Sequence, residues 1–512
     1  MAVTSLPETA AAQAASRSMP VVSPISGEVV GQVPRLTADK VIGAVRSARA
    51  AQVEWAARPF KERAAIIIRF HDAILKQSED LFEVLHRESG KSYRDAFVEL
   101  FAVACEARYY AYNGGKWLRP QRIRPAIPVR DRSQVVYHPW GVIGSISPWN
   151  FPFILTMGDT IPALLAGNAV VLKPSSKTPL TALWGRERLV EAGLPPELFQ
   201  VVSGAAREIA DVLVAHTDYI MFTGSTETGR ELAVKAARRL IPYSMELGGK
   251  NAMIVLPGSD LNHAARVAIE GSFNNAGQVC ISFERLYVHD AVYEPFKKLL
   301  VEKTAGLRLG AQGGFDVDMG SMIDAEQAHA ADAHVREAAE MGATVLQGGQ
   351  FRPDLGPAFY EPTLLEHVRP EMAVYGHETF GPVLSLYRVG SAEEAVRLAN
   401  DSPYGLHYGV YSGDLRLGER LAAQLQAGSV CVNDSYMSWG ALDGPMGGFK
   451  QSGVGRRHGP EGIRKYTQPQ TIVTNQTRWQ IGTTESALAL NGTLAKWLIR
   501  LLGVWRRVPF VR

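Results

Sequence analysis

The run Val142-Ile143-Gly144-Ser145-Ile146 is short, apolar and bounded by turn residues, and similar runs recur later in the chain. Two of them are Ala169-Val170-Val171-Leu172 and Tyr219-Ile220-Met221-Phe222, and segments with helical spacing lie between the runs. Short buried strands that alternate with helices are typical of βαβ units, which build parallel sheets. The sequence therefore predicts an α/β fold.

The alternation of helices and strands is predicted over most of the chain. In the N-terminal part apolar residues recur at helical spacing, and the pair Gly114-Gly115 is expected to end the third helix there. Helices are expected at Thr37–Ala57, Lys61–Glu88, Asp95–Tyr112, Thr181–Ala192, Ala206–Ala215 and from near Leu261, and further strands at Ala252–Leu256, Arg285–Val288, Ser385–Tyr387 and Ser429–Val432.

Length, charge and cysteine content narrow the class of protein. A chain of 512 residues is long enough for two or more domains, and its net charge of +3 is too small to indicate nucleic acid binding. The three cysteines, Cys105, Cys280 and Cys431, do not form a disulfide framework and indicate a reducing, cytoplasmic environment. Residues 1–20 lack the features of a signal peptide and are predicted to be a disordered arm. No apolar run is long enough to span a membrane.

Residues 479–512 differ in composition from the rest of the chain. No acidic residue follows Glu485. Trp497, Leu498, Leu501, Leu502 and Trp505 fall on one side of a helix, and Lys496, Arg500 and Arg507 fall on the other. This pattern predicts a basic amphipathic helix, which suits an anionic membrane surface. The alternative is a helix that packs on a neighbouring subunit or gates the substrate entrance.

Three residues are candidates for covalent chemistry. Cys280 ends the segment Phe273-Asn274-Asn275-Ala276-Gly277-Gln278-Val279-Cys280, where small and amide residues allow close approach to a reactive sulfur. Glu246 lies before paired glycines, and a buried carboxylate there can accept a proton from water. Asn150 follows a buried strand, where its amide can donate to an oxyanion. Taken singly, each residue also fits a plain structural role: a small core cysteine, a solvated loop carboxylate and a turn asparagine.

A glycine-containing turn follows the third apolar run. In Phe222-Thr223-Gly224-Ser225-Thr226-Glu227-Thr228-Gly229 a strand ends and a helix begins, so backbone N–H groups can face a pyrophosphate. The segment matches neither the usual G-x-G-x-x-G pattern nor a Walker A loop, and alone it is a weak signal.

Taken in order, these segments resemble the aldehyde dehydrogenase superfamily, and the match covers roughly Val21 to Val473. The resemblance implies a Rossmann-like cofactor domain at 21–118 and 140–248 and an α/β catalytic domain at 249–446. It also implies a small β oligomerisation arm with a bridging segment at 119–139 and 447–478, which makes a homodimer or homotetramer. The matching motifs are Pro148-Trp149-Asn150-Phe151-Pro152, Lys173-Pro174-Ser175, Phe222-Thr223-Gly224-Ser225, Glu246-Leu247-Gly248-Gly249-Lys250, Gly277-Gln278-Val279-Cys280, Glu378-Thr379-Phe380-Gly381-Pro382 and Pro445-Met446-Gly447-Gly448-Phe449-Lys450-Gln451-Ser452-Gly453.

The resemblance implies an enzyme that oxidises an aldehyde to a carboxylic acid with NAD(P). Cys280 would form a thiohemiacetal and then a thioester, Asn150 and the Cys280 backbone N–H would hold the oxyanion, and Glu246 would activate water. No metal is expected. The cofactor-binding residues implied by the resemblance are Ile146, Ser147, Pro148, Trp149, Lys173, Ser175, Ser176, Gly204, Thr223, Gly224, Ser225, Leu247, Gly248, Glu378 and Phe380.

The residue at position 176 bears on the choice of cofactor. Family members that prefer NAD commonly have Glu three residues after the Lys of Lys-Pro-Ser, and this chain has Ser176 there. A hydroxyl beside Lys173 can bind a 2′-phosphate through charge-assisted hydrogen bonds, so use of NADP is predicted. The alternative is that Ser176 only weakens discrimination in favour of NAD.

Two departures from the family pattern bear on the substrate. The segment from Gly453 to Gly462 is similar to a bacterial branch often labelled succinic semialdehyde dehydrogenase. Well-understood succinic semialdehyde enzymes resemble each other in an Arg shortly after Asn-Phe-Pro, which pairs with the substrate carboxylate, and this chain has Gly158 where that Arg would fall. A buried carboxylate without a cation is costly, so apolar medium- or long-chain aldehydes are the first prediction. Succinic semialdehyde is the runner-up, and a non-catalytic relative is the alternative from another class. Arg457 stands where many members have Glu, which puts a proton-relay role there in doubt.

Overall fold

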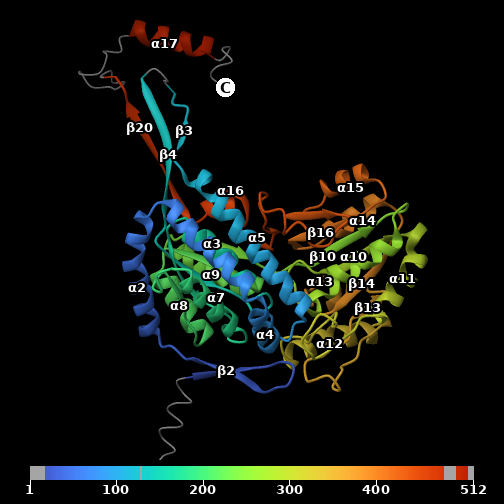
Figure 1. The fold of residues 1–512 in the computed structure, drawn as a ribbon. Coiled ribbons are helices and arrows are strands. Elements are labelled where there is room, and N and C mark those ends of the chain that lie inside the picture. The colour runs from blue at the N-terminus through green and yellow to red at the C-terminus, as the bar shows by residue number, and fades with distance from the viewer. Residues whose placement is uncertain (1–17, 127–129, 478–491, 506–512) are drawn as a thin grey trace, which may run out of the picture. The chain divides into compact units, whose positions relative to one another are not determined.

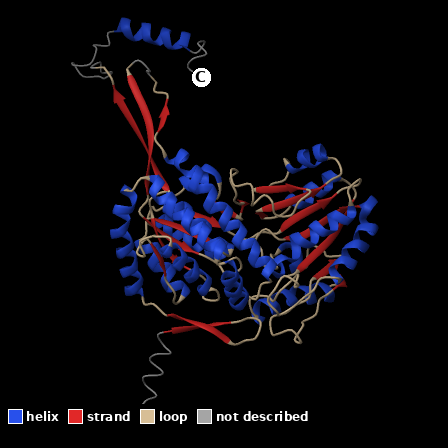
Figure 2. Ribbon diagram, viewed as in Figure 1, coloured by secondary structure: helices blue, strands red, loops and turns tan. Residues whose placement is uncertain are grey.

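The computed structural model describes residues 18–126, 130–477 and 492–505 (Figure 1). Contacts within the chain define two compact units. One comprises Met1–Trp117 with Pro139–Gln468, and the other comprises Leu118–His138 with Pro469–Arg512. Helices and mainly parallel strands alternate through the first unit, which confirms the predicted α/β fold (Figure 2).

A six-stranded sheet in the first unit has the order β19-β9-β8-β5-β6-β7. The five strands from β9 to β7 are parallel, and β19 pairs antiparallel with β9 at the edge. All five residues of β6 and of β8 are buried, as expected for strands covered by helices on both faces. The strands are β5 (Val142–Ile146), β6 (Ala169–Lys173), β7 (Phe199–Val201), β8 (Tyr219–Thr223), β9 (Tyr243–Glu246) and β19 (Gly453–Val454).

The helices around this sheet come from the first half of the chain, except for α16. The helices α2 and α8 contact each other and both contact β5 and β6, while α6 also contacts β6 and is contacted by α3 (Figure 1). The helices are α2 (Ala38–Ala57), α3 (Phe60–Lys76), α4 (Ser78–Ser89), α5 (Tyr93–Leu118), α6 (Ile154–Leu165), α7 (Pro179–Glu191), α8 (Ala206–His216), α9 (Thr226–Arg238) and α16 (Gly459–Arg464).

A seven-stranded sheet in the same unit has the order β12-β13-β14-β11-β10-β16-β17. Along β10, Met253 and Val255 belong to one hydrophobic core, and Ala252 and Ile254 belong to another on the opposite face. This period of two buries both faces of the sheet. Its strands are β10 (Asn251–Val255), β11 (Phe283–His289), β12 (Thr344–Gln347), β13 (Thr363–Glu366), β14 (Val383–Val389), β16 (His407–Tyr411) and β17 (Ser429–Val432); its helices are α10 (Leu261–Phe273), α11 (Tyr293–Ala305), α12 (Ala325–Glu340), α13 (Ala373–Gly376), α14 (Ala392–Asn400) and α15 (Leu415–Ala422).

Three small sheets complete the described strands. The strands β1 (Ser18–Val22) and β2 (Val29–Pro34) form a hairpin, β15 (Tyr404–Gly405) pairs with β18 (Phe449–Lys450), and a three-stranded sheet has the order β20-β4-β3. In that last sheet β3 (Gln121–Ile123), β4 (Asp131–Pro139) and β20 (Thr467–Asn475) fall in the segments predicted as the oligomerisation arm.

Two local predictions were wrong. Gly114 and Gly115 do not end a helix, because α5 continues to Leu118. A Cβ atom at Gly115 would lie 2.9 Å from Phe60 Cδ1, and one at Gly114 would lie 2.9 Å from Ile463 Cδ1, so the glycines serve close packing. Residues 18–20, predicted as part of a disordered arm, lie in β1, where Met19 pairs with Val33 and Val21 is buried. Residues 1–17 lie outside the described part.

The C-terminal segment contains a helix, as the apolar spacing predicted. Helix α17 runs from Gly492 to Trp505, and Trp497, Ile499, Leu502 and Val504 are exposed on it. The predicted basic residues 506, 507 and 512 lie outside the described residues. Within the described ranges no helix has the length and apolar character needed to cross a bilayer.

Candidate functional site

Five neighbouring parallel strands of the six-stranded sheet end at the same edge, and most predicted cofactor residues lie at or just after these ends. In this sheet Ile146 is level with Lys173, and Thr223 is level with Glu246. From β5 the chain adds β6 and β7 on one side and then β8 and β9 on the other, so the order of the strands reverses between β5 and β8. Ligands of α/β sheets bind at such a reversal point. Ser147, Pro148 and Trp149 follow β5, Ser175 and Ser176 follow β6, Gly204 follows β7, Gly224 and Ser225 follow β8, and Leu247 and Gly248 follow β9.

The two remaining cofactor residues reach this edge from the turn before β14. The Gly249 N–H donates to Glu378 Oε1 at 2.8 Å, and a Cβ atom at Gly248 would lie 2.3 Å from Glu378 Oε2. Only glycine at 248 allows this approach. Phe380 makes an edge-on contact with Trp149 at 5.4 Å between ring centroids. Burial raises the pKa of Glu378 to about 8.

A buried ion pair fixes the turn that carries Glu378 and Phe380. Lys250 pairs with Glu284, and Glu284 also accepts hydrogen bonds from the N–H groups of Thr379 and Phe380, at 2.9 and 3.1 Å. Both ionic side chains are almost fully buried. Neither Lys250 nor Glu284 was predicted to have this role, although Lys250 stands in the glycine motif.

The edge of the sheet suits a dinucleotide. Helix α9 begins there with Ser225 as its N-cap, and the N-terminus of a helix attracts an anion. The Lys173 ammonium is buried and makes no ion pair among the residues described, and burial lowers its pKa. Ser176 is exposed beyond the end of β6. A buried lysine without an ion-pair partner among the described residues and a helix N-terminus, both at this edge, suit a phosphate-bearing ligand.

The segment before Cys280 has an unusual backbone. Asn275, Ala276 and Gly277 have φ values of +50°, +54° and +70°, in the left-handed region. A Cβ atom at Gly277 would lie 2.1 Å from the carbonyl oxygen of Gly381. Such conformations persist only where surrounding contacts enforce them, and they concentrate at functional sites. The turn presents Cys280, which is half-buried, just before β11.

Side-chain amides hold this turn. The Asn275 amide donates to the carbonyl oxygen of Asn150 at 2.9 Å, and the Asn251 amide donates to the carbonyl oxygens of Cys280 and Ser282, both at 2.8 Å. Asn251 Oδ1 in turn accepts from the N–H of His407 at 3.0 Å. The backbone of the predicted nucleophile is therefore fixed from both sides.

Asn150 lies against the same turn. Its amide nitrogen donates one hydrogen to the carbonyl oxygen of Gln278 at 3.0 Å, and Lys91 Nζ donates to the Asn150 carbonyl at 2.8 Å. An amide nitrogen carries two hydrogens, so a second N–H remains for a substrate oxygen. Asn150 and Cys280 both line one cavity. The structure therefore brings the predicted nucleophile and oxyanion donor together.

Glu246 ends β9, and its side chain is 4% exposed. Its Oε1 atom accepts no hydrogen bond from any described residue. Burial raises the pKa of Glu246 to about 7, and Arg457 and Lys465 oppose this rise. Burial also raises the pKa of Cys280 to about 12, with Glu378 adding to the rise and Arg457 opposing it. Glu246 is outside the lining of the cavity that contains Cys280, although the two groups interact electrostatically.

The cavity beside Cys280 has a volume of about 350 Å³. Its lining is mainly apolar and aromatic, and its charged members are Asp95 and Glu270. Neither lysine nor arginine occurs among the residues that line it. The other lining residues are Phe97, Val98, Phe101, Ala102, Cys105, Asn150, Phe151, Ile154, Leu155, Asn274, Val279, Ile281, Tyr436, Met437, Trp439, Gly440, Leu442 and Met446.

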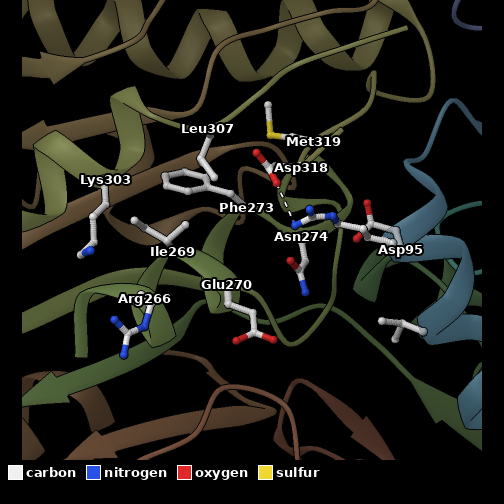
Figure 3. A pocket seen from close by; sticks show the side chains of 12 residues that line it. Asp95, Arg266, Ile269, Glu270, Phe273, Asn274, Lys303, Leu307, Asp318 and Met319 are labelled. Atoms are coloured by element: carbon white, nitrogen blue, oxygen red, sulfur yellow. Dashed lines mark ion pairs between the residues drawn. The ribbon is translucent and has the colours of Figure 1, made fainter. Parts of the chain in front are cut away.

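A second cavity of about 420 Å³ shares Asp95, Val98, Glu270 and Asn274 with the first (Figure 3). Arg94, Arg266 and Lys303 line only this second cavity, and Arg94 is already paired with Asp318 at 2.8 Å (Figure 3). Cations are therefore near the first cavity but do not form its wall.

The space beside Gly158 is occupied by an acid. A Cβ atom at Gly158 would lie 2.8 Å from Oε2 of Glu106, a buried residue of α5. Burial and the nearby Asp159 raise the pKa of Glu106 to about 8. An arginine at 158 would therefore displace Glu106. The sequence signal for a polar cluster here was Asp159, an acid within the otherwise apolar helix α6, but it was not recognised.

The site combines a sheet edge that suits a dinucleotide with Cys280, the Asn150 amide and the buried Glu246 carboxylate. These are the groups that an oxidoreductase with a thioester intermediate requires. A model of the aldehyde dehydrogenase family matches residues 11–472. The chain therefore belongs to the aldehyde dehydrogenase family, and the prediction of an NAD(P)-dependent enzyme of this kind is confirmed.

Individual relatives agree with this assignment. A Mycolicibacterium smegmatis protein named putative succinate-semialdehyde dehydrogenase (NADP+) is 47% identical over 481 residues, which cover 94% of this chain and 92% of that protein. The crystal structure of a Burkholderia pseudomallei succinate-semialdehyde dehydrogenase is 34% identical with a TM-score of 0.86 and covers 90% of this chain and 95% of that one. The crystal structure of a point mutant of Staphylococcus aureus betaine aldehyde dehydrogenase in complex with NAD+ is 31% identical, with a TM-score of 0.87. The match covers 91% of this chain and 96% of that one.

Proposed function

We propose that this protein oxidises an aldehyde to the carboxylic acid, with Cys280 as nucleophile, Asn150 as oxyanion donor and Glu246 as base. The observation that carries the proposal is the turn that presents Cys280 beside the Asn150 amide in one cavity. Cys280 Sγ attacks the carbonyl carbon, and the carbonyl oxygen takes the electron pair and is held by the Asn150 amide and the Cys280 N–H.

Oxidation and hydrolysis follow at the same carbon. NAD(P), when bound at the edge of the six-stranded sheet, accepts the hydride from that carbon. Glu246 then removes a proton from water, whose oxygen attacks the thioester carbon, and the C–S bond breaks. A pKa of about 7 allows Glu246 to exchange protons near neutral pH.

Both NADP and NAD are proposed as cofactors. Ser176 and the unpaired Lys173 leave room and positive charge for a 2′-phosphate, and the M. smegmatis relative is named for NADP. The S. aureus structure contains NAD+. Initial rates with each cofactor at a fixed aldehyde concentration test this proposal. A cofactor that supports no turnover would be excluded.

For the substrate, we propose an apolar aldehyde of medium or long chain. The support is the cavity wall, which holds aromatic and aliphatic side chains, two carboxylates and no cation. Transfer of a carboxylate into such a wall is unfavourable. The names of the relatives favour succinic semialdehyde instead, and this is the second candidate. The cavity wall, in contrast, is a property of this chain.

A matched pair of aldehydes separates the two candidates. In 4-methylpentanal an isopropyl group replaces the carboxylate of succinic semialdehyde at nearly the same size. Formation of NADPH is measured at 340 nm for this pair and for a series of unbranched aldehydes. We expect kcat/KM to be higher for 4-methylpentanal than for succinic semialdehyde. Among the unbranched aldehydes we expect kcat/KM to rise with chain length, and Phe101→Ala should lower it for the long chains only. A higher value for succinic semialdehyde would establish the second candidate.

A non-catalytic role is tested by removing the nucleophile. Cys280→Ser is expected to abolish oxidation while the protein still binds NADPH, measured by fluorescence. Cys105→Ser is the matched control, because Cys105 lines the same cavity but has no part in the proposed reaction. Persistent oxidation in Cys280→Ser would refute the assignment of the nucleophile.

Assembly and surface contact are also proposed from the sequence. The strands β3, β4 and β20 are proposed to pair between subunits of a homodimer or homotetramer, which light scattering of the full chain tests.

The exposed apolar residues of α17 are proposed to contact an anionic membrane. Co-sedimentation with phosphatidylglycerol vesicles tests this contact, and a change of assembly state on deletion of 479–512 without sedimentation would assign the helix to a neighbouring subunit.

A further inference from the structure

Arg457 lies close to the strand that ends at Glu246. Strand β19 pairs antiparallel with β9, with Gly453 level with Glu246, and Arg457 follows β19 by three residues. Its backbone is fixed by two hydrogen bonds with Met446, and its side chain is 6% exposed. The chain thus places a buried guanidinium in the layer that contains the proposed base.

Four hydrogen bonds to two side chains fix the direction of this guanidinium, and the longest joins Arg457 Nε to Asp159 Oδ1 at 3.4 Å. Arg457 Nη2 donates to Asp159 Oδ2 at 2.6 Å and to Thr223 Oγ1 at 2.6 Å, and Arg457 Nε donates to Asp159 Oδ2 at 3.2 Å. Thr223 is level with Glu246 in the pairing of β8 with β9. Arg457 is therefore bonded to the strand neighbour of Glu246.

The polar cluster around Arg457 has more cations than anions. Asp159 accepts from Lys465 Nζ at 3.0 Å and from the Tyr466 hydroxyl at 2.8 Å in addition to Arg457. Arg457 and Lys465 therefore share one carboxylate. Burial lowers the pKa of Lys465, whereas Asp159 and Glu246 raise the pKa of Arg457 although burial opposes this, so Arg457 is the cation that stays charged. Burial beside these cations lowers the pKa of His458 to about 3, and burial raises that of Glu106 to about 8, so both are neutral at pH 7.

The charge of Arg457 acts on both reacting groups. The charged groups that act electrostatically on Glu246 are Arg457, Lys465, Asp159 and Arg456, and Tyr219 is also coupled to it; Arg457 favours the carboxylate most. Arg457 is also the cation that favours the thiolate of Cys280. During hydrolysis the negative charge passes from Glu246, which takes a proton from water, to the Cys280 sulfur released from the thioester. A cation near both positions stabilises the charge at each end of this transfer.

We propose that Arg457 is an electrostatic positioning residue: its guanidinium, oriented by Asp159 and Thr223, supplies buried positive charge that stabilises the anionic forms of Glu246 and Cys280 relative to their protonated forms. The inference rests on the proposed function of these two residues. It assigns a role to the position at which many family members have a glutamate.

The test uses the full-length protein and a reagent that reads the thiolate directly. The rate of Cys280 alkylation by iodoacetamide is measured from pH 6 to 10 with mass-spectrometric mapping, because Cys105 and Cys431 are also free. In Arg457→Met we expect the rate at pH 8 to fall about tenfold, as for a rise of one unit in pKa. In the same variant the acid limb of the pH profile for single-turnover thioester hydrolysis should move to higher pH. Arg457→Lys should restore much of the alkylation rate and of the parental pH profile.

Two further variants separate charge from structure. Asp159→Asn removes the negative partner, so it should raise the alkylation rate, whereas a merely structural cluster would give a loss in both variants. Arg63→Met is the matched control, because Arg63 is a buried arginine whose hydrogen bonds go to backbone carbonyls. If Arg457→Met does not fold, the opposite shifts expected of Asp159→Asn and the native-like profile expected of Arg457→Lys still decide the matter.

Unchanged profiles in Arg457→Met, or a reduced rate in Asp159→Asn, would overturn the proposal. Failure of the proposed function gives a different result, because Cys280→Ser would then retain aldehyde oxidation whatever the behaviour of Arg457.

Discussion

Replacing Gly277 with alanine perturbs the turn that presents Cys280 without touching a reacting group. The native φ of +70° is unfavourable for alanine by about 1–2 kcal/mol. The new Cβ atom would also lie 2.1 Å from the carbonyl oxygen of Gly381, and relieving such overlap in a packed region costs about 1–3 kcal/mol. The expected loss of stability is therefore about 2–5 kcal/mol.

Gly258→Ala separates conformational strain from steric overlap. Gly258 has a similar φ of +78° but no heavy atom within 4 Å of its would-be Cβ atom. It should therefore lose only the strain of about 1–2 kcal/mol. Thermal unfolding of both variants at one protein concentration gives the comparison.

Activity provides the second measurement. Because the backbone of Gly381 cannot yield freely, Gly277→Ala should displace the turn, and a displacement of about 1 Å can lower the rate about 100-fold. Gly258→Ala should retain the parental kcat. Equal losses of stability and of kcat in the two variants would refute the claim that close approach to Gly381 fixes the position of Cys280.

Three further perturbations address the carboxylates and the cofactor edge. Glu246→Gln should give one burst of NADPH per active site and then stop, because the thioester is no longer hydrolysed; steady turnover in a stopped-flow trace would contradict this. In the parent enzyme the rate of thioester hydrolysis should be half-maximal near pH 7 and fall about tenfold per unit below it, because protonated Glu246 cannot accept a proton; a pH-independent rate in quench-flow would exclude Glu246 as the base. Ser176→Glu should lower kcat/KM for NADP about tenfold or more by charge repulsion while that for NAD is maintained, and equal changes for both cofactors would argue against contact with the 2′-phosphate.

Much of the fold could be predicted because the buried strands are explicit in the sequence. The runs of β5, β6 and β8 are mainly apolar and are separated by helical patterns, so the fold class and the order of the elements follow from local signals. Gly114 and Gly115 misled the prediction because local propensity favours a helix end. Their real role is set by Phe60 and Ile463, residues distant in sequence.

The candidate site could be predicted where its residues lie in a sequence motif. It could not be predicted where the protonation of a side chain depends on charged residues that are distant in sequence. Cys280, Asn150 and the glycines after Glu246 lie in recognisable segments. The pairing of Lys250 with Glu284, and of Arg457 and Lys465 with Asp159, joins residues up to some 300 positions apart. Such pairs depend on tertiary packing, so the proton affinity of Glu246 could not be judged from its own surroundings in sequence.

The hydrogen bonds of Asn251 have a mechanical consequence. Asn251 holds the Cys280 and Ser282 carbonyls, and the short segment Glu246–Asn251 connects it directly to the proposed base. The path between base and nucleophile is thus one turn of chain and one side chain, anchored to β16 through His407. Because one short segment supports both groups, a shift of Asn251 would move the backbone of the nucleophile relative to that of the base.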